Sequence, residues 1–200
     1  MPIDSLVRML ACVKADGRSV SHALIIDAAA GATRRVGRSE ILTRITISGL
    51  VPGDIVLVPD EAAPTGGAIS RLLSTTSGTD QNRMCDGIIV RKAGENDGSI
   101  VFDIGYFDLK SGNPSGYEGQ FISAQCFFKS YVISILKSFY AKNCRIGKER
   151  FVVLHTDKSG RAFVRKPPTR PTRDSANRPG RAVKLIVEDG QTVSRSQIIG

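Results

Sequence analysis

The sequence predicts an α+β fold, close to the α/β class, in which a long helix packs on a mixed central β-sheet. Three observations support this prediction. A strand, a polar turn and a second strand follow one another between Cys85 and Lys110. An apolar-rich segment with helical spacing follows, from about residue 115 to 141. Further β-branched runs near residues 151 and 182 supply strands for the same sheet.

Length and composition fit one globular domain. The chain has 200 residues, of which 41% are hydrophobic, so a real core can form. We expect a single domain over residues 1–200, with its core at about 50–155. No apolar run reaches the roughly 18 residues of a membrane span, so none is expected. The four cysteines show no C-x-x-C spacing, which argues against a zinc site and favours the reducing cytoplasm.

The first third of the chain is predicted to hold a helix, two strands and one undecided segment. Apolar residues near helical spacing predict a short helix that ends at Ala15. Ser19–Asp27 has the pattern of a strand, whereas Ser39–Ile45 fits either a helix turn or an irregular strand. Pro52-Gly53 predicts a turn, after which a buried strand runs to Pro59.

The long helix has recognisable ends. Ser115 and Glu118 form a capping-box pattern at its start, and Asn143–Gly147 is expected to end it. The remaining predicted elements are strands at Arg150–His155, Arg161–Arg165 and Ala182–Val187, a hairpin turn at Asp157–Gly160 and a turn at Glu188–Gly190.

The net charge of +9 indicates the kind of partner, because a basic chain of this size favours a polyanion such as nucleic acid. The other explanation is a basic but unspecialised surface. Two stretches could contact phosphate. The first is an arginine cluster, which could equally be a solvated loop, and the second is a proline-rich segment at 166–181 that is expected to be an exposed basic loop. Their basic residues are Arg34, Arg35 and Arg38, then Lys166, Arg170, Arg173, Arg178 and Arg181.

The central unit contains residues suited to metal chemistry. Asp86 precedes its first strand, and Asp108 and Lys110 end its second strand. Two neighbouring carboxylates repel each other, and a divalent cation such as Mg²⁺ or Mn²⁺ relieves that repulsion. A lysine two residues from an acid lies on the same face of a strand, where it can orient or deprotonate a water or steady transition-state charge.

Whether the two acids meet depends on the hairpin register. A five-residue loop at 94–98 would place Asp86 opposite Tyr106, with Asp108 as its diagonal neighbour on the same face. A two- or four-residue loop would turn Asp86 to the other face, unless Gly105 acted as a bulge. On the same count, Asp103 points away from Asp108.

Over roughly residues 80–155, the chain resembles the PD-(D/E)XK nuclease superfamily. The shared pattern is an acid, a strand, an acid-x-Lys triplet and then a helix that bears glutamine. The resemblance implies a restriction-endonuclease-like fold and metal-dependent cleavage of DNA, or less readily RNA, in a restriction or defence system. It implies that Asp86 and Asp108 bind the metal, that Lys110 serves the water, and that Gln120 or Gln125 positions it, with Gln120 nearer.

The chain departs from the family pattern at several places. Cys85 stands where the motif has proline, the second acid is aspartate rather than glutamate, and Glu40 is only the best match for an upstream helical glutamate. The acids could also be a turn and a strand-end ion pair, and the glutamines ordinary polar helix positions. The alternative function is a non-catalytic module of the same fold that binds nucleic acid or a protein partner; a homodimer or a partner subunit is also compatible with the sequence.

Overall fold

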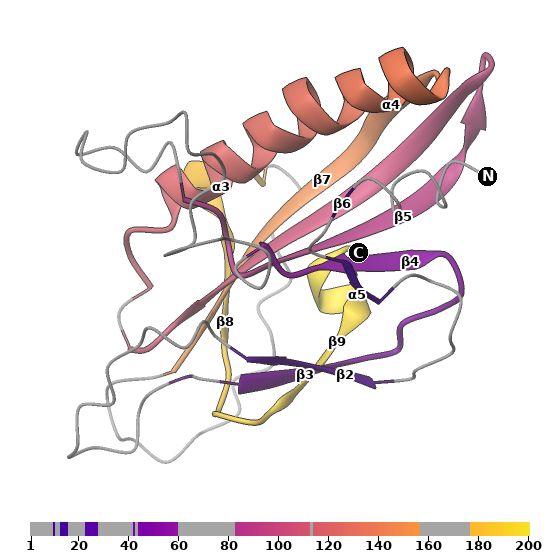
Figure 1. Ribbon diagram of the computed structural model, residues 1–200. Helices are drawn as coiled ribbons and strands as arrows, with labels where there is room; N and C mark the ends of the chain where they lie inside the picture. The colour runs from indigo at the N-terminus through magenta and orange to yellow at the C-terminus, as the bar shows by residue number, and fades with distance from the viewer. Residues whose placement is uncertain are drawn as a thin grey trace.

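The computed structural model describes residues 10, 13–15, 23–27, 42, 44–59, 83–112, 114–156 and 177–200. These residues form a six-stranded sheet with strand order β1-β4-β5-β6-β7-β8 and a three-stranded sheet with order β2-β3-β9 (Figure 1). The strands are β1 (Val13–Ala15), β2 (Ala23–Asp27), β3 (Arg44–Ser48), β4 (Asp54–Leu57), β5 (Gly87–Asn96), β6 (Ser99–Lys110), β7 (Cys144–His155), β8 (Val183–Ile186) and β9 (Thr192–Ser194). The helices are α3 (Glu118–Cys126), η1 (Phe127–Val132), α4 (Ile133–Tyr140), η2 (Pro179–Arg181) and α5 (Arg195–Ile198).

The larger sheet is mixed, as the sequence predicts. β4, β5 and β6 pair antiparallel, whereas β7 pairs parallel to β6 and β8 pairs parallel to β7. A parallel pair needs a crossover connection, and the helical segment between β6 and β7 supplies it. The α+β class with a mixed sheet and one long helix is therefore confirmed.

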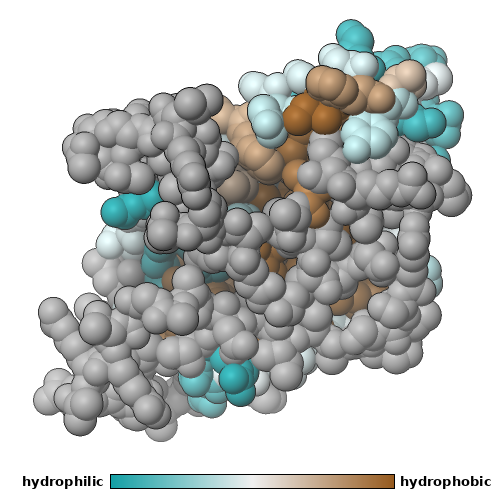
Figure 2. All heavy atoms as spheres, viewed as in Figure 1, coloured by the Kyte–Doolittle hydropathy of each residue, from teal (hydrophilic) through white to brown (hydrophobic). Residues whose placement is uncertain are grey.

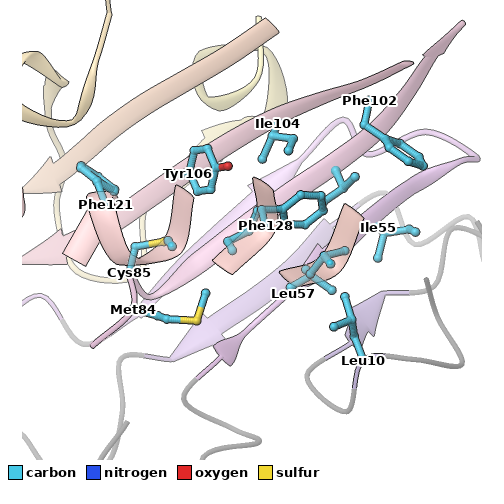
Figure 3. Packing of buried hydrophobic residues seen from close by; sticks show 14 of the residues in the cluster. Leu10, Ile55, Leu57, Met84, Cys85, Phe102, Ile104, Tyr106, Phe121 and Phe128 are labelled. Carbon is cyan, nitrogen blue, oxygen red and sulfur yellow. The ribbon is translucent and has the colours of Figure 1, made fainter. Parts of the chain in front are cut away.

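Both faces of the larger sheet are buried, which explains why β6 is a nearly continuous apolar run. On one face, alternate β6 residues such as Ile104 and Tyr106 pack against Phe121 and Phe128 of the helix (Figure 3). On the other face, Phe107 and its neighbours pack against the smaller sheet and α5. The molecule thus has three layers: helix, six-stranded sheet, and small sheet with a short helix (Figure 1).

The long helix differs from the expected segment 115–141 at both ends. It runs from 118 to 140 through a π-helical turn at η1. The capping-box prediction is wrong: Tyr117 is the N-cap and makes no side-chain cap bond, and Gly116, with φ +72°, turns the chain between Ser115 and the helix. The helix ends at a left-handed Ala141, so Asn143–Gly147 does not end it. Cys144 instead begins β7, since β6 offers it a parallel edge.

Other predicted elements have mixed outcomes. Val13–Ala15 is a strand rather than the end of a helix, because β4 offers it an edge to pair with. The undecided segment contributes to strand β3 from Arg44. The predicted strands at Ser19–Asp27, after Pro52-Gly53, at Arg150–His155 and at Ala182–Val187 appear as β2, β4, β7 and β8. The hairpin at 157–165 lies outside the described residues.

Apolar side chains remain exposed on the outer surface of the helix. Tyr131 is 58% exposed and stacks on Phe127, and Phe139 is 81% exposed. Figure 2 shows hydrophobic residues gathered over the region of α4, at the upper right of the view. The described residues therefore leave an apolar helix surface uncovered.

A buried ion pair ties the end of the described chain to the larger sheet. Asp54, at the start of β4, is 2% exposed, and its two carboxylate oxygens lie 2.6 and 3.0 Å from Nε and Nη2 of Arg195. Asp54 also accepts the Val51 backbone N–H at 2.9 Å. This contact holds α5 against the larger sheet.

We predict that Asp54→Asn lowers the free energy of unfolding by about 3 kcal/mol, because it leaves the buried Arg195 guanidinium without its counter-charge. Urea denaturation followed by circular dichroism measures the change. Lys92→Gln is the matched control: it breaks an exposed pair with Glu95 in the same sheet and should change stability by less than about 0.5 kcal/mol. Equal effects of the two substitutions would contradict the stabilising role of the buried pair.

Candidate functional site

The β5–β6 hairpin determines which residues face each other. Asn96 pairs with Ser99 around a two-residue turn, Asp97-Gly98, whose φ angles are +49° and +70°. Two positive φ angles are typical of the tight hairpin turn that Asp-Gly favours. The five-residue loop expected at 94–98 is therefore wrong. The register also shifts between Lys92 and Gly94, so one extra residue, Ala93, forms a bulge.

The bulge restores the face that the tight turn would have reversed. Below it the ladder runs regularly to the pair Gly87–Phe107, and one further step sets Asp86 opposite Asp108. Without the extra residue, Asp86 would fall opposite Leu109 and point to the other face. Gly105 is not the bulge, since it pairs regularly with Ile89. Its missing side chain serves packing instead: a Cβ there would lie 2.8 Å from the Ile198 carbonyl oxygen of α5.

The carboxyl groups of Asp86 and Asp108 are in contact. Asp86 is partly exposed and accepts the Leu109 backbone N–H through Oδ2 at 2.5 Å, whereas Asp108 is buried. Burial, followed by the negative charge of Asp108 and a hydrogen bond between the two carboxyls, raises the pKa of Asp86 to about 8. Asp86 therefore keeps a proton near neutral pH and shares it with Asp108.

Lys110 joins the acids to the long helix. Its Nζ lies 2.8 Å from Asp108 Oδ2 and donates to Gln120 Oε1 at 2.7 Å. An ammonium group has three donors, so these two contacts leave one for another acceptor. The Lys110 side chain is 22% exposed, so this donor can reach a bound molecule. Asp86, Asp108, Lys110 and Gln120 thus converge at one end of the sheet.

Gln125 belongs to a different cluster. Its Nε2 donates to Glu149 Oε2 at 3.0 Å, and Lys129 Nζ lies 2.7 Å from the same oxygen. The Tyr106 hydroxyl donates to Glu149 Oε1 at 3.2 Å. Of the two candidate glutamines, Gln120 bonds Lys110 beside the acids, whereas Gln125 bonds Glu149. Asp103 lies on the opposite face of β6, where it pairs with Arg91 at 2.9 Å, as expected.

The basic residues are only partly described. Arg178 and Arg181 are exposed at the ends of η2, which lies against the first turn of α3. The other candidate residues lie outside the described part of the chain: Arg34, Arg35, Arg38, Lys166, Arg170, Arg173 and the helical glutamate candidate Glu40.

The end of β7 adds residues that sequence reasoning missed. His155 pairs with Lys110 in the parallel ladder and lies on the same face, half-buried, with its Nδ1 3.1 Å from the Thr156 carbonyl oxygen. The Thr156 backbone N–H donates to the Lys110 carbonyl at 3.3 Å, and its hydroxyl accepts the Gly112 N–H at 2.7 Å. These bonds fix the chain on both sides of Lys110. The strand around His155 was predicted, but its place beside β6 was not.

The donor set fits one class of metal. The described residues contain no cluster of three or more His, Cys, Asp or Glu side chains suited to hold a metal ion. Asp86 and Asp108 supply two carboxylates with an unfavourable mutual repulsion. Mg²⁺ and Mn²⁺ are commonly held by one or two carboxylates, with water and substrate phosphate as the other ligands. The pair suits such a cation and does not suit a zinc ion bound wholly by protein.

Comparison with protein-family models, with curated proteins and with solved structures found no match to this chain. None of the helices in the described residues has the length and apolar character needed to cross a membrane. The function of this protein must therefore be inferred from the geometry around Asp86, Asp108 and Lys110.

We predict that Asp86→Asn stabilises the metal-free protein increasingly as pH rises from about 4 to about 8. The raised pKa means that folded Asp86 binds its proton more tightly than unfolded Asp86 does. This contribution to stability is fully present at low pH and is lost as pH rises through about 8. Asparagine has no carboxyl proton to lose. The free energy of unfolding of Asp86→Asn should therefore exceed that of the wild type by a few kcal/mol above pH 8, as an order of magnitude.

Urea denaturation in EDTA at pH 5, 7 and 9 measures this difference. Asp97→Asn, in the exposed hairpin turn, is the control for removal of one aspartate charge. If the wild-type and Asp86→Asn proteins lost stability in parallel over this range, the contact between the two carboxyls would not be the source of the shift.

Proposed function

We propose that this protein is a metal-dependent nuclease that hydrolyses phosphodiester bonds of nucleic acid, with DNA favoured over RNA. One observation carries the proposal: Asp86, Asp108, Lys110 and Gln120 converge from the start of β5, the end of β6 and the first turn of α3. The PD-(D/E)XK resemblance implies Asp86 and Asp108 as the two acids, Lys110 as the lysine, and Gln120 or Gln125 as the helical glutamine. The proposal includes a restriction-endonuclease-like fold and a cytoplasmic role in restriction or defence.

Asp86 and Asp108 would hold the metal. Bound there, Mg²⁺ or Mn²⁺ would polarise a phosphoryl oxygen and lower the pKa of a bound water. The protein's own contribution is a pair of oxygen donors held face to face by the hairpin register, with the Leu109 N–H orienting one of them. A site that has already positioned its ligands needs little reorganisation when substrate arrives.

Lys110 has the charge and position to stabilise the transition state. Its Nζ lies 2.8 Å from an Asp108 carboxylate oxygen, and an ammonium group can donate a hydrogen bond but cannot accept a proton from water. We therefore assign Lys110 to the developing negative charge on the phosphoryl oxygens rather than to water deprotonation. Gln120 accepts from Lys110, so its role is to orient the ammonium group.

The charge of the molecule agrees with a polyanionic substrate. The net charge is +9, and two exposed arginines, Arg178 and Arg181, lie on the turn beside α3. Contacts to phosphates position a protein on nucleic acid without selecting a base sequence. Such contacts add affinity that weakens as the salt concentration rises.

A second candidate is a non-catalytic module that binds a protein partner or nucleic acid. The exposed Tyr131 and Phe139 on the helix favour a protein partner, because large exposed aromatic side chains are enriched at protein–protein interfaces. This surface lies on the outside of the helix, away from the sheet. A binding role there is compatible with catalysis and becomes the main candidate only if catalysis is absent.

We predict that the wild-type protein cleaves plasmid or single-stranded DNA with Mg²⁺ or Mn²⁺, and that Lys110→Ala slows cleavage by about 10²–10³-fold. Asp86→Asn and Asp108→Asn should lose as much or more, because each removes a metal ligand. Gln120→Ala should be slower by about tenfold, through loss of Lys110 orientation. Initial rates on end-labelled substrates, with melting curves to confirm folding, measure these effects.

The two glutamines provide a matched control. Gln125→Ala, on the same helix but bonded to Glu149, should remain within about threefold of wild type. If Gln125→Ala were as slow as Gln120→Ala, the assignment of Gln120 would be wrong. If the wild type bound DNA in a salt-sensitive way but did not cleave it with either metal, the binding module would replace the nuclease.

A further inference from the structure

A groove of about 400 Å³ lies along the edge of β7, separate from the site formed by Asp86, Asp108 and Lys110. Its lining residues come from three segments of the chain: 148–150 in β7, then Asn177 and 181–183, and finally 199–200. None of the four converging site residues lines this groove.

The groove exists because β8 begins late. β8 pairs with β7 only from Val152 onward. At the preceding residue, the Asn177 side chain replaces a strand: its Oδ1 accepts the Phe151 N–H at 2.6 Å, and its Nδ2 donates to the Phe151 carbonyl at 3.0 Å. Gly180 in η2 faces the carboxylate end of the Glu118 side chain at the start of α3. These contacts hold η2 against the helix, beside the groove.

The groove carries excess positive charge. Its cations are Lys148, Arg150 and Arg181, and Arg150 Nη1 donates to the Ser196 carbonyl at 3.4 Å. Among the described residues, no carboxylate lies within ion-pair distance of Lys148 or Arg181, although the Lys148 charge helps to lower the pKa of Asp103. The one acid in the lining, Glu149, is already bonded by Lys129, Gln125 and Tyr106.

The first turn of α3 connects the groove to the candidate catalytic site. Gln120 bonds Lys110 at one side of this turn, and Glu118 abuts Gly180 of η2 at the other. His155 is the ladder partner of Lys110, and Arg150 precedes it by five residues on the same strand. Five strand residues span about 16 Å, and because their number is odd, the Arg150 and His155 side chains point to opposite faces of the sheet.

We propose that this groove binds the phosphate backbone of nucleic acid beyond the phosphodiester held at Asp86, Asp108 and Lys110, where the substrate passes the edge of β7 that β8 leaves uncovered. The inference rests on the proposed nuclease function and adds the path of the nucleic acid across the protein surface. Three cations around a groove of about 400 Å³, beside a site suited to phosphate, favour nucleic acid over an acidic protein.

The test is DNA binding in EDTA, where no metal-dependent cleavage occurs, with a fluorescent duplex of roughly 16 base pairs, a length that spans both sites. Lys148→Gln combined with Arg181→Gln should weaken binding by about tenfold or more. It should also reduce the slope of log affinity against log salt concentration by about two, one for each lost phosphate contact. Lys137→Gln combined with Lys142→Gln removes the same charge from the far end of the helix and its following loop, and should change neither quantity.

The outcomes separate this inference from the proposed function. If the wild type cleaves DNA and the groove variant binds and cleaves the same duplex as the wild type does, the groove inference is wrong and the nuclease stands. If the wild type does not cleave but the groove variant alone loses DNA binding, the groove is a nucleic-acid site and the nuclease is wrong. If the wild type does not bind DNA but binds polyglutamate, and the groove variant loses that binding, the groove belongs to an acidic protein partner.

Discussion

The register of the β5–β6 hairpin is the constraint on which both the core and the candidate site depend. These two strands form the middle of the larger sheet, and both faces of that sheet are buried. Because side chains alternate between faces, a slip of one residue would exchange the two faces. The tight Asp97-Gly98 turn and the bulge at Ala93 together give the register in which apolar residues meet the correct layer and Asp86 faces Asp108. The same register that satisfies the core therefore assembles the acids.

The buried acids of this protein differ in how their charge is compensated. Asp54 and Asp103 each contact an arginine, and each also accepts a backbone N–H. These are the properties of structural ion pairs, in which one cation offsets one anion. Asp86 and Asp108 instead face each other and have Lys110 as a cation in contact. Two carboxyls against one ammonium group are costly for stability, and such arrangements are concentrated at functional sites.

Local signals in the sequence predicted the hairpin strands, the helix after them and the later strands, because each carries a strong pattern of its own. Elements that depend on long-range pairing were predicted less well. Val13–Ala15 is a strand only because β4 is beside it, and Cys144 extends β7 because β6 offers a parallel edge. The capping pattern at Ser115 failed because Gly116 turns the chain before the helix begins. Asp86 and Asp108 reached the same face for a different reason from the one expected, a tight turn with a bulge in place of a longer loop.

The sequence by itself determined the chemical inventory: two acids and a lysine at strand ends, a helix with two glutamines, and a strongly basic charge. Tertiary structure alone decided which of these groups meet. It selected Gln120 over Gln125, placed His155 beside Lys110, and opened a basic groove where β8 starts late. The physical reason is that periodicity within a segment indicates only which face a residue occupies. Contact between distant segments depends on register, strand order and the helical crossover, and no short stretch of sequence determines these.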